Sequence, residues 1–140
     1  MPDSALTRLA TAVLDVPVPE RALVVGCGDG EPVLFLAREF LSARVRGVDR
    51  SAERVRAASA RVGLDPEGRV AFKQSKSRRL PFPDGFFDLV VIFEGRPAAS
   101  EIARVMRPEA GLILISPPTP GPLSSLCERL WRRRLPRAGI

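Results

Sequence analysis

Short apolar segments alternate with amphipathic segments along most of the chain. The apolar segments have the length of buried strands and little polar alternation, as in parallel sheets. The expected strands are Arg21 to Gly26, Val45 to Val48, Val70 to Phe72, Phe87 to Phe93 and Leu112 to Ile115. The expected helices, with apolar residues at helical spacing, are Ser4 to Leu14, Pro32 to Phe40, the segment from its cap Ser51 to Gly63, and Pro97 to Met106, where Pro108 follows. This alternation predicts right-handed βαβ units. We therefore expect an α/β fold with a doubly wound, Rossmann-like parallel sheet of order 3-2-1-4-5 and helices on both faces.

The first expected strand leads directly into three alternate glycines. Gly26, Gly28 and Gly30 are followed by Pro32, and Cys27 lies between the first two. Glycine accepts positive φ and proline suits a first helical turn, so the pattern predicts a strand, a tight turn and a helix start. Backbone N–H groups at such a helix start suit adenine nucleosides and phosphates. The spacing is not the G-x-G-x-x-G of dinucleotide folds, so a purely structural turn stays an alternative.

Asp49 is the strongest candidate for a polar ligand contact. In doubly wound sheets the ligand lies outside the carboxyl ends of the strands, and Asp49 ends the strand next to the first one. A carboxylate there can accept two hydrogen bonds from a ribose diol. The alternative is a solvated aspartate that caps the next helix, although Ser51 already provides that cap.

Composition narrows the class of protein. The chain has 140 residues, enough for one domain, and 45% hydrophobic residues with 27% charged residues are typical of a soluble globular protein. No apolar stretch approaches the roughly 20 residues of a membrane span, so we expect a cytoplasmic location. Cys27 and Cys127 are far apart and histidine is absent, so we expect neither a disulfide framework nor a metal site.

The positive charge is concentrated at the C-terminus. The net charge is +6, and the segment from Glu128 to Arg137 carries five arginines against one acid. Pro122 to Leu135 has apolar residues along one side, which predicts a basic amphipathic helix. Packing over the sheet is one role for this helix, and docking on nucleic acid, an anionic membrane or a second subunit is the other.

Four segments resemble the class I S-adenosylmethionine-dependent methyltransferases. Ala22 to Gly30 is similar to their glycine motif, and Gly47 to Glu53 is similar to the ribose motif that follows it. Leu80 to Val91 and Glu101 to Pro108 resemble the segments around the fourth and fifth strands of the small-molecule subgroup. The resemblance covers about Arg21 to Ser116, most of the chain.

The resemblance implies S-adenosylmethionine as cofactor, S-adenosylhomocysteine as product and a small molecule as methyl acceptor. The cofactor-binding residues that it implies are Gly26, Cys27, Gly28, Gly30, Asp49, Arg50, Lys76 and Ser77. Val24 and Lys76 occupy positions where the family usually has acids, so we expect weaker cofactor binding than is usual there. A catalytically degenerate binding or interaction module therefore stays an alternative to an active enzyme.

Glu94 follows the fourth expected strand at the mouth of the ligand crevice and is the candidate catalytic base. The alternative is a surface glutamate in a loop. The chain after this strand reads Phe93-Glu94-Gly95-Arg96 and lacks the N/D-P-P-Y/F motif of base methylation, so a nucleic-acid methyltransferase is not favoured.

The chain is expected to form one domain, with an N-terminal helix in 1–20, a core in 21–116, and a proline-rich turn and basic helix in 117–140. The closing antiparallel strands of the family are not found in the sequence. Leu112 to Ile115 is therefore expected to be an edge strand, and such an edge favours a homodimer through the strand or cover by the C-terminal helix.

Overall fold

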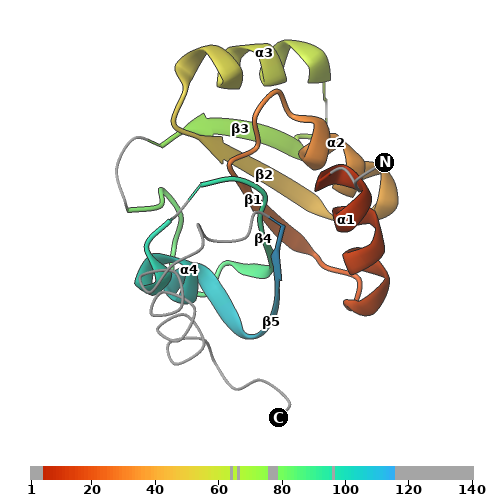
Figure 1. The fold of residues 1–140 in the computed structure, drawn as a ribbon, viewed down its shortest axis with the longest axis vertical. Helices are drawn as coiled ribbons and strands as arrows, with labels where there is room; N and C mark the ends of the chain where they lie inside the picture. The colour runs from red at the N-terminus through yellow and green to blue at the C-terminus, as the bar shows by residue number, and fades with distance from the viewer. Residues whose placement is uncertain (1–4, 64, 66, 76–78, 96, 116–140) are drawn as a thin grey trace.

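The computed structural model describes residues 5–63, 65, 67–75, 79–95 and 97–115 (Figure 1). The basic helix expected over Pro122 to Leu135 lies outside these residues. The helices are α1 (Ala5–Ala12), the 3-10 turn η1 (Val13–Asp15), α2 (Glu31–Glu39), α3 (Ala52–Val62) and α4 (Ala99–Val105). The strands are β1 (Arg21–Val25), β2 (Arg44–Asp49), β3 (Val70–Gln74), β4 (Phe87–Ile92) and β5 (Met106–Leu114).

The strands of the described residues form one sheet of order β3-β2-β1-β4-β5. Every pairing in it is parallel, with Val24 of β1 opposite Gly47 of β2 on one side and Val91 of β4 on the other. The expected strand order is confirmed. The carboxyl ends of β1, β2 and β4 consequently lie together at one edge of the sheet.

Two hydrophobic clusters cover the two faces of the sheet. Alternate residues of β1 divide between them, Val24 facing the cluster with α1 and α2 and Leu23 facing the cluster with α4. A Cβ built on Gly30 would lie 3.0 Å from Ala58 of α3 and 3.1 Å from Phe72 of β3, and Phe72 packs against the first cluster. Helices α1, α2 and α3 therefore share one face and α4 covers the other, as Figure 1 shows. The prediction of helices on both faces is confirmed.

Local signals in the sequence set the starts of α2 and α3. Gly30 precedes α2 with φ 94°, and Pro32 lies in the first turn. N–H groups of the first turn have no partner within the helix, so the missing N–H of proline costs no helical hydrogen bond. Ser51 caps α3, its hydroxyl accepting a hydrogen bond from the Arg54 N–H at 3.3 Å. Gly63 ends α3 with φ 65°. Both caps of α3 agree with the sequence expectation.

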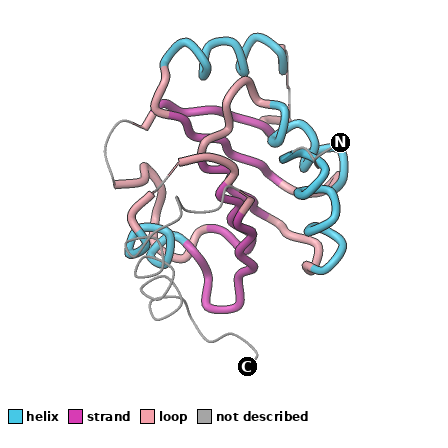
Figure 2. The backbone as a smooth tube through the Cα atoms, viewed as in Figure 1, coloured by secondary structure: helices cyan, strands magenta, loops and turns pink. Residues whose placement is uncertain are grey.

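The predicted helix from Pro97 to Met106 is too long. Helix α4 ends at Val105, and Met106 already pairs with Phe87 as the first residue of β5. Pro108 has no N–H to donate to the carbonyl of Arg104, as a continuing helix would require, and the N–H of Gly85 donates to that carbonyl instead. Pro108 therefore does not end a helix but lies in the irregular start of β5, which Figure 2 shows as a U-shaped bend.

The first helix also differs from its prediction over Ser4 to Leu14. Regular α-helix ends at Ala12, and the chain tightens into the 3-10 turn η1 before Pro17. Leu14, expected on the buried stripe, is 76% exposed. The tighter turn rotates Leu14 away from the face on which Leu9 and Val13 are buried.

Candidate active site at the glycine turn

The turn between β1 and α2 is fastened to the neighbouring strand β2. The N–H groups of Gly26 and Cys27 both donate to the carbonyl of Val48, at 2.9 and 3.0 Å, and the N–H of Gly30 donates to the carbonyl of Cys27 at 3.0 Å. The turn therefore lies across the carboxyl ends of β1 and β2, where ligands bind in doubly wound sheets.

Gly26 and Gly28 are required for different reasons, although both have positive φ, 74° and 57°. A Cβ on Gly26 would overlap the backbone carbonyl of Glu94, because the chain leaving β4 passes directly over this position. A Cβ on Gly28 would meet no described atom within 4 Å. Gly26 thus allows the glycine turn to pack against the chain after β4. Gly28 instead presents bare backbone to open space, where a ligand can approach it.

The carboxylate of Asp49 lies against this bare backbone. Its Oδ2 accepts a hydrogen bond from the Gly28 N–H at 3.0 Å, and its Oδ1 accepts one from the Ser51 N–H at 2.9 Å. Asp49 is only 8% exposed and is the one buried polar or charged residue in the described part of the chain. Each carboxylate oxygen keeps a lone pair free, so Asp49 is oriented and still able to accept hydrogen bonds from a diol.

Glu94 and Arg54 complete the mouth of the site. Glu94 follows β4, with its N–H 3.3 Å from the carbonyl of Val25, and its carboxylate is 56% exposed. Arg54, in the first turn of α3, places Nη1 3.4 Å from Glu94 Oε2 and 3.8 Å from Asp49 Oδ2. Sequence reasoning missed Arg54. Its position one helical turn after the cap Ser51 was the only available signal, because Glu94 is distant in the sequence.

The Cys27 thiol is poorly suited to act as a nucleophile. Its side chain is 1% exposed, and burial, followed by the negative charge of Asp49, raises the pKa of the thiol to about 12. A thiol in that state is protonated at neutral pH and is a poor nucleophile. Cys27 therefore acts as a small apolar residue beneath the turn.

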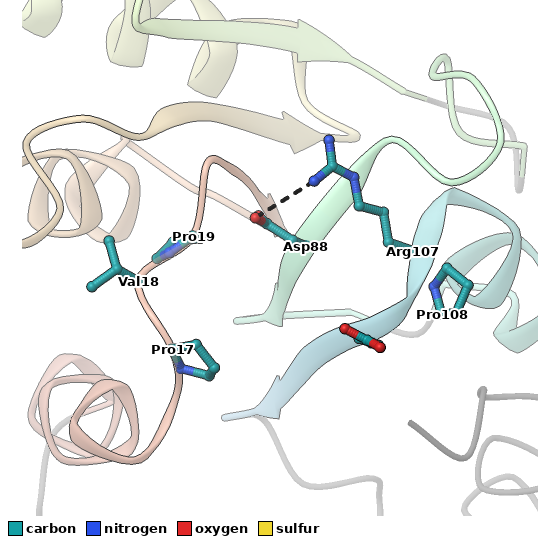
Figure 3. Close-up of a pocket in the computed structure, with 7 residues that line it drawn as sticks. Pro17, Val18, Pro19, Asp88, Arg107 and Pro108 are labelled. Atoms are coloured by element: carbon teal, nitrogen blue, oxygen red, sulfur yellow. Dashed lines mark ion pairs between the residues drawn. The ribbon is translucent and has the colours of Figure 1, made fainter. Parts of the chain in front are cut away.

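A cavity of about 530 Å³ lies at the amino ends of the strands, on the opposite side of the sheet from the glycine turn at their carboxyl ends (Figure 3). Its walls come from Pro17 to Pro19 before β1, from Asp88 near the start of β4 and from Arg107 to Glu109 of β5. Asp88 accepts hydrogen bonds from the N–H groups of Glu20 and Arg21, and Arg107 lies 3.9 Å from it. The cavity is separate from the glycine turn, because it opens at the amino ends of the strands.

Among the described residues, no group of three or more Cys, Asp or Glu side chains is placed to hold a metal ion. In the same part of the chain, every helix is too short or too polar to cross a bilayer.

A model of the methyltransferase domain matches residues 22–109, which span the glycine turn, Asp49 and Glu94. The chain belongs to the class I S-adenosylmethionine-dependent methyltransferases. The match covers more than half of the chain. It includes β2 and β4, the strands that lead to Asp49 and Glu94. Small-molecule enzymes of this family are among the relatives of the chain.

Three similar proteins illustrate the relationship. The 27-O-demethylrifamycin SV methyltransferase of Amycolatopsis mediterranei is 31% identical over 91% of this chain and 52% of its own length. An O-methyltransferase of Penicillium expansum is 34% identical over 78% of this chain and 42% of its own length. The crystal structure of a SAM-dependent methyltransferase from Methanosarcina mazei superposes with a TM-score of 0.61 at 28% identity, over 74% of this chain and 55% of that one. The methyltransferase domain described here thus spans about half the length of these relatives.

The residues of this methyltransferase domain fit the cofactor that the family uses. Bare backbone at Gly28 and a buried, oriented carboxylate at Asp49 are suited to a nucleoside with a ribose diol. The structure brings together the following predicted cofactor residues: Gly26, Cys27, Gly28, Gly30 and Asp49. Arg50 follows directly and is exposed, whereas Lys76 and Ser77 lie outside the described residues. Val24, where the family usually has an acid, is fully buried.

Proposed function

We propose that this domain binds S-adenosylmethionine on the glycine turn and transfers its methyl group to a hydroxyl oxygen of a small molecule. The observation that carries the proposal is the buried Asp49 carboxylate, held by the N–H of Gly28 beside a surface of bare backbone. Arg54, half-exposed and 3.8 Å from Asp49 Oδ2, offsets the cost of burying this charge only in part, which favours a role of Asp49 in ligand binding.

The small-molecule acceptor is supported by the relatives. The Amycolatopsis protein is named a 27-O-demethylrifamycin SV methyltransferase, and the Penicillium protein is named an O-methyltransferase. We transfer only the acceptor class to this chain, a hydroxyl group on a small organic molecule.

The cofactor, when bound, supplies a methyl group on positively charged sulfur, so the reaction needs positioning more than activation. Gly28 allows close approach to the backbone, and Asp49 accepts hydrogen bonds from the ribose hydroxyls. Glu94, at the end of β4, is in our proposal the base that takes the proton from the acceptor hydroxyl. Its exposed carboxylate can reach a substrate that enters from solvent at the mouth of the site.

A transfer assay with methyl-labelled cofactor and a panel of phenolic and aliphatic hydroxyl compounds tests this function. The parent and the control Glu109→Gln, which changes an acid at the opposite edge of the sheet, are expected to label at least one acceptor. Glu94→Gln is expected to be slower by about a hundredfold or more at saturating cofactor, since it cannot take the proton. Cofactor binding without labelling of any acceptor would contradict the enzyme proposal and favour a binding module.

A further inference from the structure

Arg54 is the cation that lies between the two acidic groups of the site. Its guanidinium is 3.4 Å from the carboxylate of Glu94, at the end of β4, and 3.8 Å from that of Asp49, at the end of β2. The glycine turn passes between these two strand ends. Arg54 therefore brings a fixed positive charge to the place where a ligand on the turn would meet the same two carboxylates.

The contribution of Arg54 to the site is electrostatic and not structural. Asp49 already accepts hydrogen bonds from two backbone N–H groups, and its 3.8 Å separation from Arg54 is longer than a hydrogen bond. The Arg54 side chain is 56% exposed, so removing it leaves no buried donor or acceptor unpaired. Its helix is fixed independently by the Ser51 cap and by the burial of Ala58.

We propose that Arg54 determines the charge selectivity of the site, weakening the binding of S-adenosylmethionine relative to S-adenosylhomocysteine. This inference rests on the proposed function. The cofactor carries a sulfonium, an ammonium and a carboxylate, whereas the product has a neutral thioether in place of the sulfonium. The two ligands thus share a shape and differ by one positive charge. Arg54 repels the positive charge of the sulfonium, which the product lacks, so it acts on the cofactor and leaves the product nearly unaffected.

The size of the effect follows from the exposure of the residues. A charge interaction between half-exposed groups contributes little free energy. Its usual strength corresponds to a change in ligand affinity of roughly two- to fivefold. The Glu94 carboxylate neutralises part of the Arg54 charge, which keeps the expected change within that range. Because the charges are exposed, added salt should reduce the effect.

Calorimetric titration of the full chain with each ligand separately tests the inference. Arg54→Met keeps an unbranched side chain and a good helix former but removes the charge. We expect it to bind S-adenosylmethionine roughly two- to fivefold more tightly than the parent at low salt, and S-adenosylhomocysteine with unchanged affinity. Arg54→Lys keeps the charge and should match the parent. Arg56→Met removes an exposed charge from the same helix and serves as the matched control.

Equal changes in the affinity for both ligands would overturn the inference, because a structural or shape effect of Arg54 does not distinguish them. The same holds if Arg54→Met binds like Arg56→Met, and in that case the proposed function stands. Failure of the parent and every variant to bind either ligand would overturn the proposed function, and the selectivity role with it.

Discussion

Replacement of Gly26 by alanine tests the account of how the glycine turn meets the end of β4. Gly26 and Gly28 lie in the same turn with similar positive φ, 74° and 57°. They differ in what an added methyl group would touch. At Gly26 it overlaps the backbone of Glu94, whereas at Gly28 it meets no described atom within 4 Å. Gly28→Ala is therefore the matched control for backbone strain alone.

The expected magnitudes follow from these neighbours. Alanine in the left-handed region costs about 1–2 kcal/mol, and roughly 0.4–1 kcal/mol of this is offset by the lower entropy of the unfolded chain. Gly28→Ala should therefore lower the free energy of unfolding by about 1 kcal/mol. Gly26→Ala must also displace the backbone after β4, and overpacking of this kind adds about 1–3 kcal/mol. We expect a total of about 3 kcal/mol for Gly26→Ala.

Urea unfolding at 25 °C, followed by far-ultraviolet circular dichroism, measures both values. The difference between the two variants is more reliable than either value, because the strain common to both cancels. A difference below about 0.5 kcal/mol would refute the close packing of the β4 end on Gly26.

Other predictions concern stability, reactivity and assembly. Arg104→Met should lower the free energy of unfolding by about 2–4 kcal/mol in urea, because its guanidinium donates to Glu101 and to the carbonyls of the 80–82 segment, and Arg104→Lys should recover only part of this. Arg104 holds the pKa of Glu101 below its ordinary value of 4.5, so this stabilisation is present above pH 4.5 and lost as the pH falls below it. Glu101→Gln should accordingly flatten the pH dependence of stability in that acidic range, and an unchanged profile would contradict the ion pair. In a Cys127→Ser background, Cys27 should resist iodoacetamide at pH 8 until the protein unfolds, as expected for a buried thiol with a pKa of about 12. Dimerisation through the β5 edge stays a prediction. Light scattering of the full chain tests it, and a monomer at all concentrations would count against it.

The strands and the glycine turn could be predicted because their signals are local, and the sheet order followed from right-handed connections between the strands. Buried strands show as continuous apolar segments, and only glycine accepts the backbone of the turn without strain. Asp49 followed from its place at the end of the second strand. Parallel pairing brings that strand end beside the turn, whereas the hydrogen bond from the Gly28 N–H to Asp49 was not part of the sequence prediction.

The boundary between α4 and β5 could not be predicted from periodicity. Met106 is apolar and fits the buried stripe of a helix as well as the start of a buried strand. Its assignment depends on tertiary contacts, namely its pairing with Phe87 and the hydrogen bond from Gly85 to the carbonyl of Arg104. Arg54 was missed for a similar reason, since its partner Glu94 follows β4 and is distant from Arg54 in the sequence.

Cofactor binding is the central claim, and calorimetric titration with S-adenosylmethionine tests it most directly. The parent is expected to bind one equivalent. Asp49→Asn, which loses a charge-assisted acceptor, should weaken binding by a factor of about ten to a hundred. Asp15→Asn, an exposed aspartate in η1, should bind like the parent, and circular dichroism should show all three folded. Absence of binding by the folded parent, or equal affinity of the parent and Asp49→Asn, would contradict the account.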